Sequence, residues 1–148
     1  MTNDNAPEPV RDASIVVARD NSGLVALLSA DFPVHGAEYL FLPGGRREAG
    51  ETDEECARRE LREEAGITAA TLRPLGSYAI SLSSTARVHL YEATELTCGP
   101  QELTETEVNF KLSWWPMPDA IQAAQQGRFL LPAGPLALLL AEKTSTAV

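Results

Sequence analysis

Short runs of aliphatic and β-branched residues, separated by clusters of turn-forming residues, mark the first third of the chain. Runs of this kind predict β-strands, and they span residues 13–19, 24–30 and 38–42. The tetrapeptide Asp20–Gly23 between the first two runs is typical of a hairpin turn. A loop is expected over residues 31–37. Gly44 and Gly45 are expected in a turn, where they allow tight backbone geometry or the close approach of a ligand.

A helical period replaces this pattern between residues 53 and 65. The apolar positions recur every four residues and are Ala57, Leu61 and Ala65. They predict one buried stripe on an amphipathic helix. Thr52 followed by Glu55 is typical of the capping box that begins a helix, and Gly66 supplies the left-handed residue that commonly ends one. We therefore expect the main helix of the protein over this segment.

The second half of the chain returns to strand-like runs and ends in two helical segments. The expected strands span residues 72–81, 86–94 and 108–114, and the expected helices span residues 119–126 and 135–143. Strands outnumber helices, which indicates an α/β fold with a mixed β-sheet covered by helices on both faces. The expected organisation is a flexible lead over residues 1–12, a single domain over residues 13–143 and a frayed tail over residues 144–148.

Composition restricts the functional classes. At 148 residues, with 44% hydrophobic and 22% charged residues, the chain is long enough for one substantial core. A formal net charge of −9 argues against general nucleic-acid binding, which requires a basic surface. No apolar run approaches the roughly 18 residues of a membrane span, and the first residues do not form a secretion signal. Cys56 and Cys98 lack metal-site spacing, so reduced thiols in the cytoplasm are expected.

Three glutamates of the main helix carry the candidate chemistry. Glu60, Glu63 and Glu64 stand at i, i+3 and i+4, so their carboxylates share one narrow face and repel one another. Hard divalent ions prefer such oxygen ligands, and Mg²⁺ combines one or two carboxylates with water and phosphate oxygens. A Mg²⁺ site for phosphate chemistry is therefore the first hypothesis, with Mn²⁺ as the alternative ion. The competing interpretation is a solvated helix with i,i+4 pairs such as Arg59–Glu63.

The segment from Gly45 to Ile67 resembles the Nudix box, GX5EX7REUXEEXGU, in which U is an aliphatic residue. All nine specified positions match, and they are Gly45, Glu51, Arg59, Glu60, Leu61, Glu63, Glu64, Gly66 and Ile67. A pattern of this specificity rarely arises by chance. The resemblance implies an α/β/α sandwich and a Mg²⁺-dependent hydrolase of nucleoside diphosphates linked to another moiety. The residues it assigns to metal ligation are Glu60, Glu63 and Glu64, and those it assigns to bracing or assisting the site are Arg59 and Glu51.

The general base is open between the main helix and a later loop. Hydrolysis of a pyrophosphate needs a group that orients or deprotonates the attacking water. Glu63 could take this role from the helix. In ADP-ribose-type relatives a glutamate in the loop before the last strand acts as base, and Glu107 matches that position best, with Glu105 second. A solvated acidic loop is the competing interpretation.

The layout after the box resembles ADP-ribose and nucleotide-sugar pyrophosphatases, although the proline that many of them carry past the box is missing. The expected reaction releases a nucleoside monophosphate and a sugar phosphate. Hydrolysis of (deoxy)nucleoside triphosphates, which sanitises oxidised nucleotides, is the alternative activity, and a non-catalytic nucleotide-sensing module is the alternative of another class. The expected partner is a nucleotide-type small molecule, without nucleic acid or membrane, and a homodimer is left open. The aromatic candidates for stacking on a nucleobase are Phe32, Tyr78 and Trp114.

Overall fold

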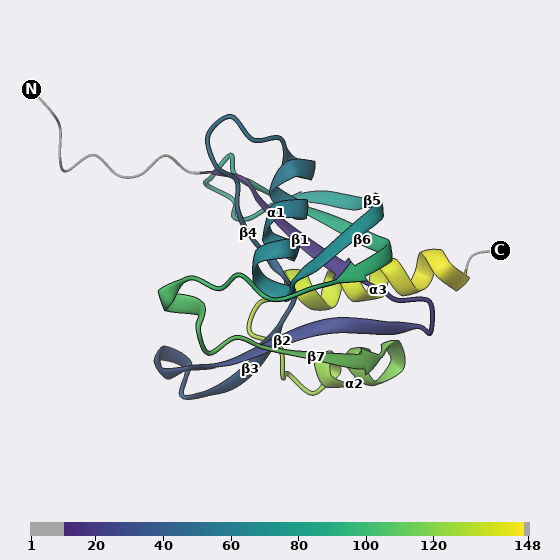
Figure 1. Cartoon of the computed structure of the whole chain (residues 1–148). Helices are drawn as coiled ribbons and strands as arrows, with labels where there is room; N and C mark the ends of the chain where they lie inside the picture. The colour runs from purple at the N-terminus through teal and green to yellow at the C-terminus, as the bar shows by residue number, and fades with distance from the viewer. Residues whose placement is uncertain (1–10, 147–148) are drawn as a thin grey trace, which may run out of the picture.

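The computed structural model describes residues 11–146, and within that range the chain forms seven strands, three α-helices and two short 3₁₀-helices (Figure 1). The strands are β1 (Ala13–Ala18), β2 (Leu24–Phe32), β3 (Ala37–Phe41), β4 (Gly44–Arg46), β5 (Ile67–Ala79), β6 (Arg87–Cys98) and β7 (Lys111–Pro116). The α-helices are α1 (Asp53–Ala65), α2 (Met117–Gln125) and α3 (Ala133–Thr146). The 3₁₀-helices are η1 (Pro33–His35) and η2 (Glu105–Glu107).

The strands divide between two sheets. The first sheet has the order β4-β1-β6-β5, and the second has the order β3-β2-β7. The first sheet is mixed because β1 runs parallel to β6, whereas its other pairs and both pairs of the second sheet are antiparallel. The chain passes from the first sheet to the second between β1 and β2, where Arg19 and Val25 form an antiparallel bridge.

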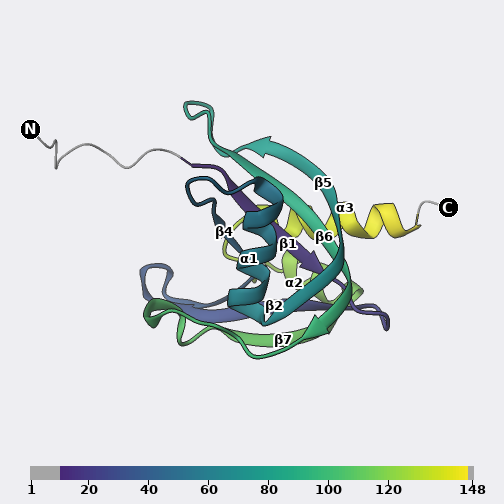
Figure 2. The same cartoon turned by 45° about the horizontal axis from the view of Figure 1, so that its top comes forward.

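Alternation along β1 places a hydrophobic core on each face of the strands. Val16 and Ala18 face a core that includes Leu61 of α1. Val17, the residue between them, faces a second core that includes Leu138 of α3. Successive side chains of a strand point to opposite faces, so α1 covers one face while α2 and α3 cover the other (Figure 1, Figure 2). The α/β/α sandwich expected from the sequence is confirmed, although its strands form two sheets and not one.

Helix α1 begins and ends where the sequence predicts. Thr52 Oγ1 accepts a hydrogen bond from the Glu55 amide at 3.1 Å, and the Glu55 carboxylate accepts one from the Thr52 amide at 3.1 Å. Gly66 ends the helix in the left-handed region, with φ of 68° and ψ of 25°, a conformation that glycine adopts without a steric penalty. Because both ends are fixed, the charged side chains of α1 have defined positions relative to β4.

Two local expectations from the sequence are wrong. The predicted turn over residues 20–23 forms, but the hairpin is limited to the Arg19–Val25 bridge, since β1 pairs with β4 and β6 while β2 pairs with β3 and β7. Gly44 and Gly45 lie in the short strand β4, antiparallel to β1, and not in a turn. Both errors have one cause, because the true pairing partners are distant in the chain and the local turn residues do not encode them.

Element ends also differ from the expectations. The observed starts of β5, β7 and α3 are Ile67, Lys111 and Ala133, against expected starts at residues 72, 108 and 135. Helix α3 continues to Thr146, so residues 144–146 of the expected frayed tail are helical. Residues 1–10 of the expected lead, together with residues 147–148, lie outside the described residues. Within residues 11–146, no helix is both long enough and apolar enough to cross a membrane.

Candidate active site

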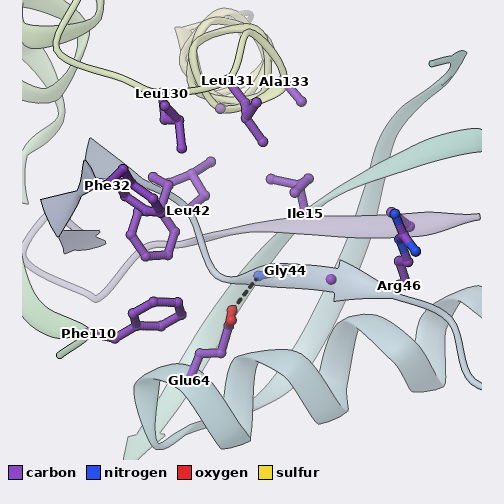
Figure 3. A pocket seen from close by; sticks show the side chains of 14 residues that line it. Ile15, Phe32, Leu42, Gly44, Arg46, Glu64, Phe110, Leu130, Leu131 and Ala133 are labelled. Atoms are coloured by element: carbon purple, nitrogen blue, oxygen red, sulfur yellow. Dashed lines mark hydrogen bonds between the residues drawn. The ribbon is translucent and has the colours of Figure 1, made fainter. Parts of the chain in front are cut away.

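Strand β4 and helix α1 bring two glycines against two glutamates. Gly45 faces the helix, and a Cβ placed on it would lie 2.5 Å from Oε1 of Glu60. The Gly44 amide donates a hydrogen bond to Oε1 of Glu64 at 2.8 Å (Figure 3). Any side chain at position 45 would displace the Glu60 carboxylate, so this close approach of strand and helix requires glycine.

Glu60 and Glu64 are buried carboxyl groups, with exposed fractions of 9% and 5%. Burial disfavours the charged form, and it raises the pKa of Glu60 to about 7 and that of Glu64 to about 9. The Glu107 carboxylate adds to both pKa shifts, whereas the Arg59 guanidinium opposes the shift at Glu60. Acids held in these surroundings are stabilised in their charged form by a nearby cation.

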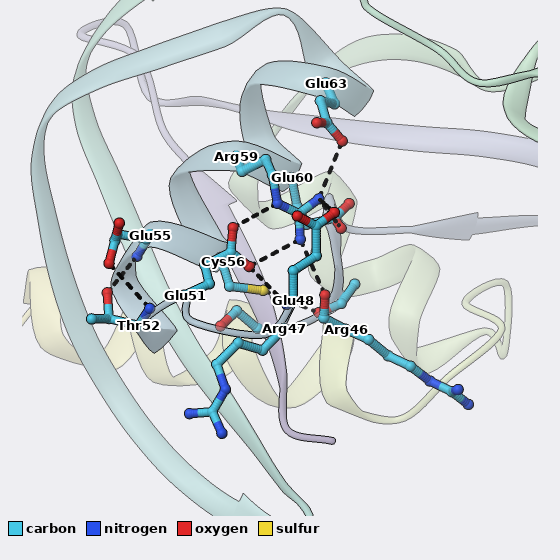
Figure 4. Close-up of polar contacts among 12 residues, drawn as sticks. Arg46, Arg47, Glu48, Glu51, Thr52, Glu55, Cys56, Arg59, Glu60 and Glu63 are labelled. Carbon is cyan, nitrogen blue, oxygen red and sulfur yellow. Dashed lines mark hydrogen bonds and ion pairs between the residues drawn. The ribbon is translucent and has the colours of Figure 1, made fainter. Parts of the chain in front are cut away.

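Arg59 lies between several carboxylates of the same segment (Figure 4). It donates two hydrogen bonds to Glu51, from Nε at 2.7 Å and from Nη2 at 3.1 Å. Its Nη1 donates to Glu60 at 2.9 Å and to Glu63 at 3.2 Å. The hydrogen bonds from Arg59 are the main reason that the pKa of Glu51 lies below its ordinary value. The Arg59–Glu51 contact expected from the sequence is therefore present, and its orienting role stays a prediction.

The loop between β6 and β7 brings Glu107 to the same cluster. Glu107 is the last residue of η2, and its carboxyl group lies near enough to Glu64 to contribute to the raised pKa of Glu64. It also accepts a hydrogen bond from the Thr104 amide at 3.1 Å, which caps its own turn. Glu107 is half-buried, whereas Glu105 is exposed. Of the two loop glutamates considered as the base, Glu107 is the one that reaches the buried acids.

The three glutamates of α1 do not form a compact set of ligands. Glu63 is held by Arg59 with 31% of its side chain exposed, and Glu64 is held by the Gly44 amide. Mutual repulsion of the carboxylates and these competing hydrogen bonds account for the spread. Among residues 11–146, the acidic and histidine side chains whose ligand atoms all lie within 4.8 Å of one another are Asp12, Asp53 and His89.

That second cluster consists of polar contacts between segments. His89 Nε2 lies 2.9 Å from Asp12 Oδ2 and 3.3 Å from Asp53 Oδ2. Arg47 lies 3.1 Å from Asp53 and supplies a positive charge there. The cluster therefore ties the chain before β1 to β6 and to the start of α1, and Glu60, Glu63 and Glu64 stay the candidate metal ligands.

An apolar cavity of about 310 Å³ opens beside Glu64 (Figure 3). Its aromatic lining residues are Phe32, Phe41 and Phe110. Arg46 lies on β4 at the other end of the cavity from Phe110 in this view. The Arg46 side chain is exposed, and its guanidinium has no ion-pair partner among residues 11–146. The cavity thus joins a buried acid, an exposed cation and an apolar wall.

Three residues that line the cavity were not indicated by the sequence, and they are Phe41, Phe110 and Arg46. Among the aromatic residues proposed for stacking from the sequence, Phe32 lines this cavity and Tyr78 lines a neighbouring apolar one. Trp114 packs against the core beneath α1 and lines neither cavity. Phe110 could have been inferred from its position shortly after Glu107. The other two carry no local signal, because only the fold brings them to the cavity.

Comparison with known proteins gives consistent matches over this region. A model of the NUDIX domain matches residues 8–133. An ADP-ribose pyrophosphatase from Mycobacterium tuberculosis is 30% identical over 121 residues, which are 80% of this chain and 58% of that protein. An oxidized purine nucleoside triphosphate hydrolase from Danio rerio is 38% identical over 65 residues, 42% of each chain. The chain spans about half the length of these curated relatives.

Two solved structures share the fold at low sequence identity. An ADP compounds hydrolase superposes with a TM-score of 0.80 and 23% identity, over 95% of this chain and 77% of that chain. A MutT structure, from a study of Aliivibrio salmonicida and Vibrio cholerae, has a TM-score of 0.66 and 16% identity, over 90% of this chain and 98% of that chain. At such identities the likeness concerns the fold alone.

Proposed function

The chain belongs to the Nudix family, and on that premise we propose that it hydrolyses a pyrophosphate bond in a nucleoside diphosphate derivative. ADP-ribose or a related nucleoside diphosphate sugar is the proposed substrate, with a nucleoside monophosphate and a sugar phosphate as products. The relative from Mycobacterium tuberculosis, an ADP-ribose pyrophosphatase, supports this choice. The observation that carries the proposal is the meeting of two buried acids, Glu60 and Glu64, with Glu107 at the edge of an apolar cavity.

The acidic residues fit a divalent metal ion. Glu60, Glu63 and Glu64 offer hard oxygen ligands, and because burial raises the pKa values of Glu60 and Glu64, a bound cation would stabilise their charged forms. Gly45 leaves the Glu60 carboxylate the space that a Cβ would fill. We propose that these glutamates hold Mg²⁺, with Mn²⁺ as an alternative. The bound ion would neutralise phosphate charge and lower the pKa of a water molecule.

The remaining polar residues position substrate and water. Glu107 is the proposed general base, because it reaches Glu64 from a loop and is free of Arg59. Glu63 is the less suited candidate, since its carboxylate accepts a hydrogen bond from Arg59. The close approach that Gly45 allows is that of the Glu60 carboxylate, and a contact of Gly44 and Gly45 with the substrate stays a prediction.

Gly45→Ala is expected to weaken divalent-ion binding by about 10- to 100-fold in a folded protein, because the added methyl group displaces the Glu60 carboxylate. Titration with Mn²⁺ in a calorimeter measures the affinity. Gly99→Ala is the matched control, since a Cβ there would lie 3.7 Å from the Gly66 carbonyl oxygen, an ordinary contact. Equal Mn²⁺ affinities for the two variants would contradict the assigned position of Glu60.

Arg59→Lys is expected to lower turnover by about 10- to 100-fold, although it keeps the charge. Lysine cannot reproduce the two parallel hydrogen bonds to Glu51 together with those to Glu60 and Glu63. Steady-state rates and Mg²⁺ dependence test the change against Arg58→Lys, which alters a partly exposed arginine on the same helix. A turnover rate of Arg59→Lys equal to that of the wild type would contradict an orienting role of Arg59.

A second activity has its own support. The oxidized purine nucleoside triphosphate hydrolase from Danio rerio is 38% identical over a shorter region of the chain. Hydrolysis of (deoxy)nucleoside triphosphates, including oxidised ones, is therefore the alternative. The proposed partner remains a nucleotide-type small molecule in both cases. Cytoplasmic location and a homodimer stay predictions.

A substrate panel tests the proposed function. ADP-ribose, nucleoside diphosphate sugars and nucleoside triphosphates are incubated with the protein and Mg²⁺, and the released nucleoside monophosphate, sugar phosphate and pyrophosphate are quantified. Monophosphate from ADP-ribose or a diphosphate sugar supports the proposal. Pyrophosphate from triphosphates alone would favour the alternative activity. Binding without any product would favour a non-catalytic nucleotide sensor.

A further inference from the structure

Most of the cavity beside Glu64 lacks hydrogen-bonding side chains. The polar side chains in its lining are those of Glu64 and Arg46, at the edge formed by α1 and β4. The rest of the wall is aliphatic or aromatic, and its aliphatic members include Ile15, Leu42, Leu130 and Leu131. A group bound away from that edge is therefore held by its shape and its apolar faces.

Three phenylalanines from separate segments build the aromatic part of the wall. Phe32 ends β2, Phe41 ends β3 and Phe110 precedes β7. The ring centroids of Phe32 and Phe41 are 5.5 Å apart and those of Phe41 and Phe110 are 4.8 Å apart, both in T-shaped contact. Edge-to-face contacts favour a defined arrangement of the rings. All three side chains are half-buried, so each keeps surface on which a planar base can stack.

Phe110 connects this wall to the acidic loop. Its amide donates a hydrogen bond to the Glu107 carbonyl at 2.8 Å. A ligand that contacts Phe110 and also reaches Glu64 therefore lies beside the proposed base. A nucleotide bound with its base against Phe110 would therefore have its phosphates near the acidic edge of the cavity.

We infer that Phe32, Phe41 and Phe110 form a nucleobase site that reads its ligand by stacking and shape, with little discrimination among bases. The inference rests on the proposed function, since it assigns the base half of that substrate. A site built to hydrogen-bond its ligand rejects a wrong one by about 10⁴–10⁵-fold, whereas an apolar pocket discriminates by only about 10–200-fold. The wall of this cavity is of the second kind, so the substrate class is nucleoside diphosphate sugars of several bases.

Binding of nucleoside monophosphates tests the inference without turnover. AMP, GMP, UMP and CMP are titrated into the full chain with Mg²⁺ in a calorimeter. The four Kd values are expected to agree within about tenfold. Ribose 5-phosphate, which lacks a base, is expected to bind at least about tenfold more weakly than AMP. Preference for one base above about a hundredfold, or equal binding of AMP and ribose 5-phosphate, would overturn the inference.

Variants locate the base on the aromatic wall. Phe110→Ala and Phe32→Ala are each expected to weaken AMP binding by about tenfold, whereas Phe110→Tyr keeps the ring and most of the affinity. Leu139→Ala, on the half-exposed outer side of α3, is the control and leaves the Kd unchanged. Thermal melts identify the variants that fold. If Phe110→Ala does not fold, the Kd of Phe32→Ala for AMP is used for the test. An unchanged Kd for AMP in both folded alanine variants would overturn the inference.

Hydrolysis of ADP-, GDP-, UDP- and CDP-ribose separates this inference from the proposed function. Values of kcat/KM within about tenfold of one another support the inference. Turnover of ADP-ribose without the other three would overturn the inference and leave the proposed function standing. The third outcome is that all four monophosphates bind with similar Kd values that depend on Phe110, while none of the four diphosphate riboses is hydrolysed. That outcome would support the base site and contradict the proposed function.

Discussion

Glu64→Gln is expected to abolish hydrolysis, with a loss of about a thousandfold or more, in a protein that still folds. The glutamine has nearly the same shape, and its side-chain oxygen can still accept the hydrogen bond from the Gly44 amide. The change removes the negative charge that a divalent ion requires of this ligand. Steady-state rates with Mg²⁺, together with circular dichroism, measure the loss of activity and the retention of the fold.

In the absence of metal, the Tm of Glu64→Gln should depend on pH differently from the Tm of the wild type. The folded protein raises the pKa of Glu64 from the ordinary value of 4.5 to about 9, chiefly through burial. The unfolded chain therefore loses this proton first, and the stability contributed by the neutral form declines as pH rises from 4.5 to about 9. Glutamine does not titrate, so the Tm of Glu64→Gln should exceed that of the metal-free wild type by a margin that grows over this window.

Glu54→Gln is the matched control for both measurements. Glu54 lies on the same helix but, unlike Glu60 and Glu64, it is exposed, and it pairs with Arg58 at 3.3 Å. Its replacement should leave the rate and the effect of Mg²⁺ on Tm as in the wild type. Full activity in Glu64→Gln, or a Tm of the wild type that does not respond to Mg²⁺, would count against a metal at this carboxylate.

Glu107→Gln is expected to lower kcat by about 10²–10⁴-fold with KM nearly unchanged, because proton transfer acts on the transition state and not on binding. The glutamine can still accept the hydrogen bond from the Thr104 amide that caps the turn. The loop therefore keeps its conformation while it loses the base. Initial rates over a range of ADP-ribose concentrations separate kcat from KM.

Glu105→Gln provides the comparison, since Glu105 is exposed on the same turn. It should change kcat by less than about twofold. A large loss in the Glu105 variant, with Glu107→Gln active, would move the base by two residues along the loop. If both variants keep the wild-type kcat, Glu63 becomes the base, and its contact with Arg59 would have to change on substrate binding.

The main helix could be predicted from the sequence because its determinants are local. The capping pair Thr52 and Glu55, the stop at Gly66 and the spacing of Glu60 and Glu64 all act within a few turns of one helix. The preference for Glu107 over Glu105 came from the family resemblance. In the structure Glu107 is half-buried near Glu64 whereas Glu105 is exposed, and the role of Glu107 as base stays a prediction.

The cavity and the sheet arrangement could not be predicted in this way. Residues that touch there come from β2, β3 and the loop before β7, and their proximity depends on pairings between distant segments. Gly44 and Gly45 are residues typical of a turn. They nevertheless form a strand, because the edge of β1 has backbone groups that require hydrogen-bond partners. The sequence around Phe41 and Phe110 does not distinguish them from ordinary core residues. Their proposed role follows only from their shared position in the cavity beside Glu64.

Release of AMP and ribose 5-phosphate from ADP-ribose, in the presence and absence of Mg²⁺, tests the central claim most directly. The reaction is run in ¹⁸O-labelled water with the wild type and with Glu64→Gln, and mass spectrometry follows both products. We expect both products from the wild type with Mg²⁺, one of them carrying ¹⁸O, and neither product after chelation or from Glu64→Gln. Products that form at the same rate with chelator, or in the Glu64→Gln variant, would contradict a metal-dependent hydrolysis at this site.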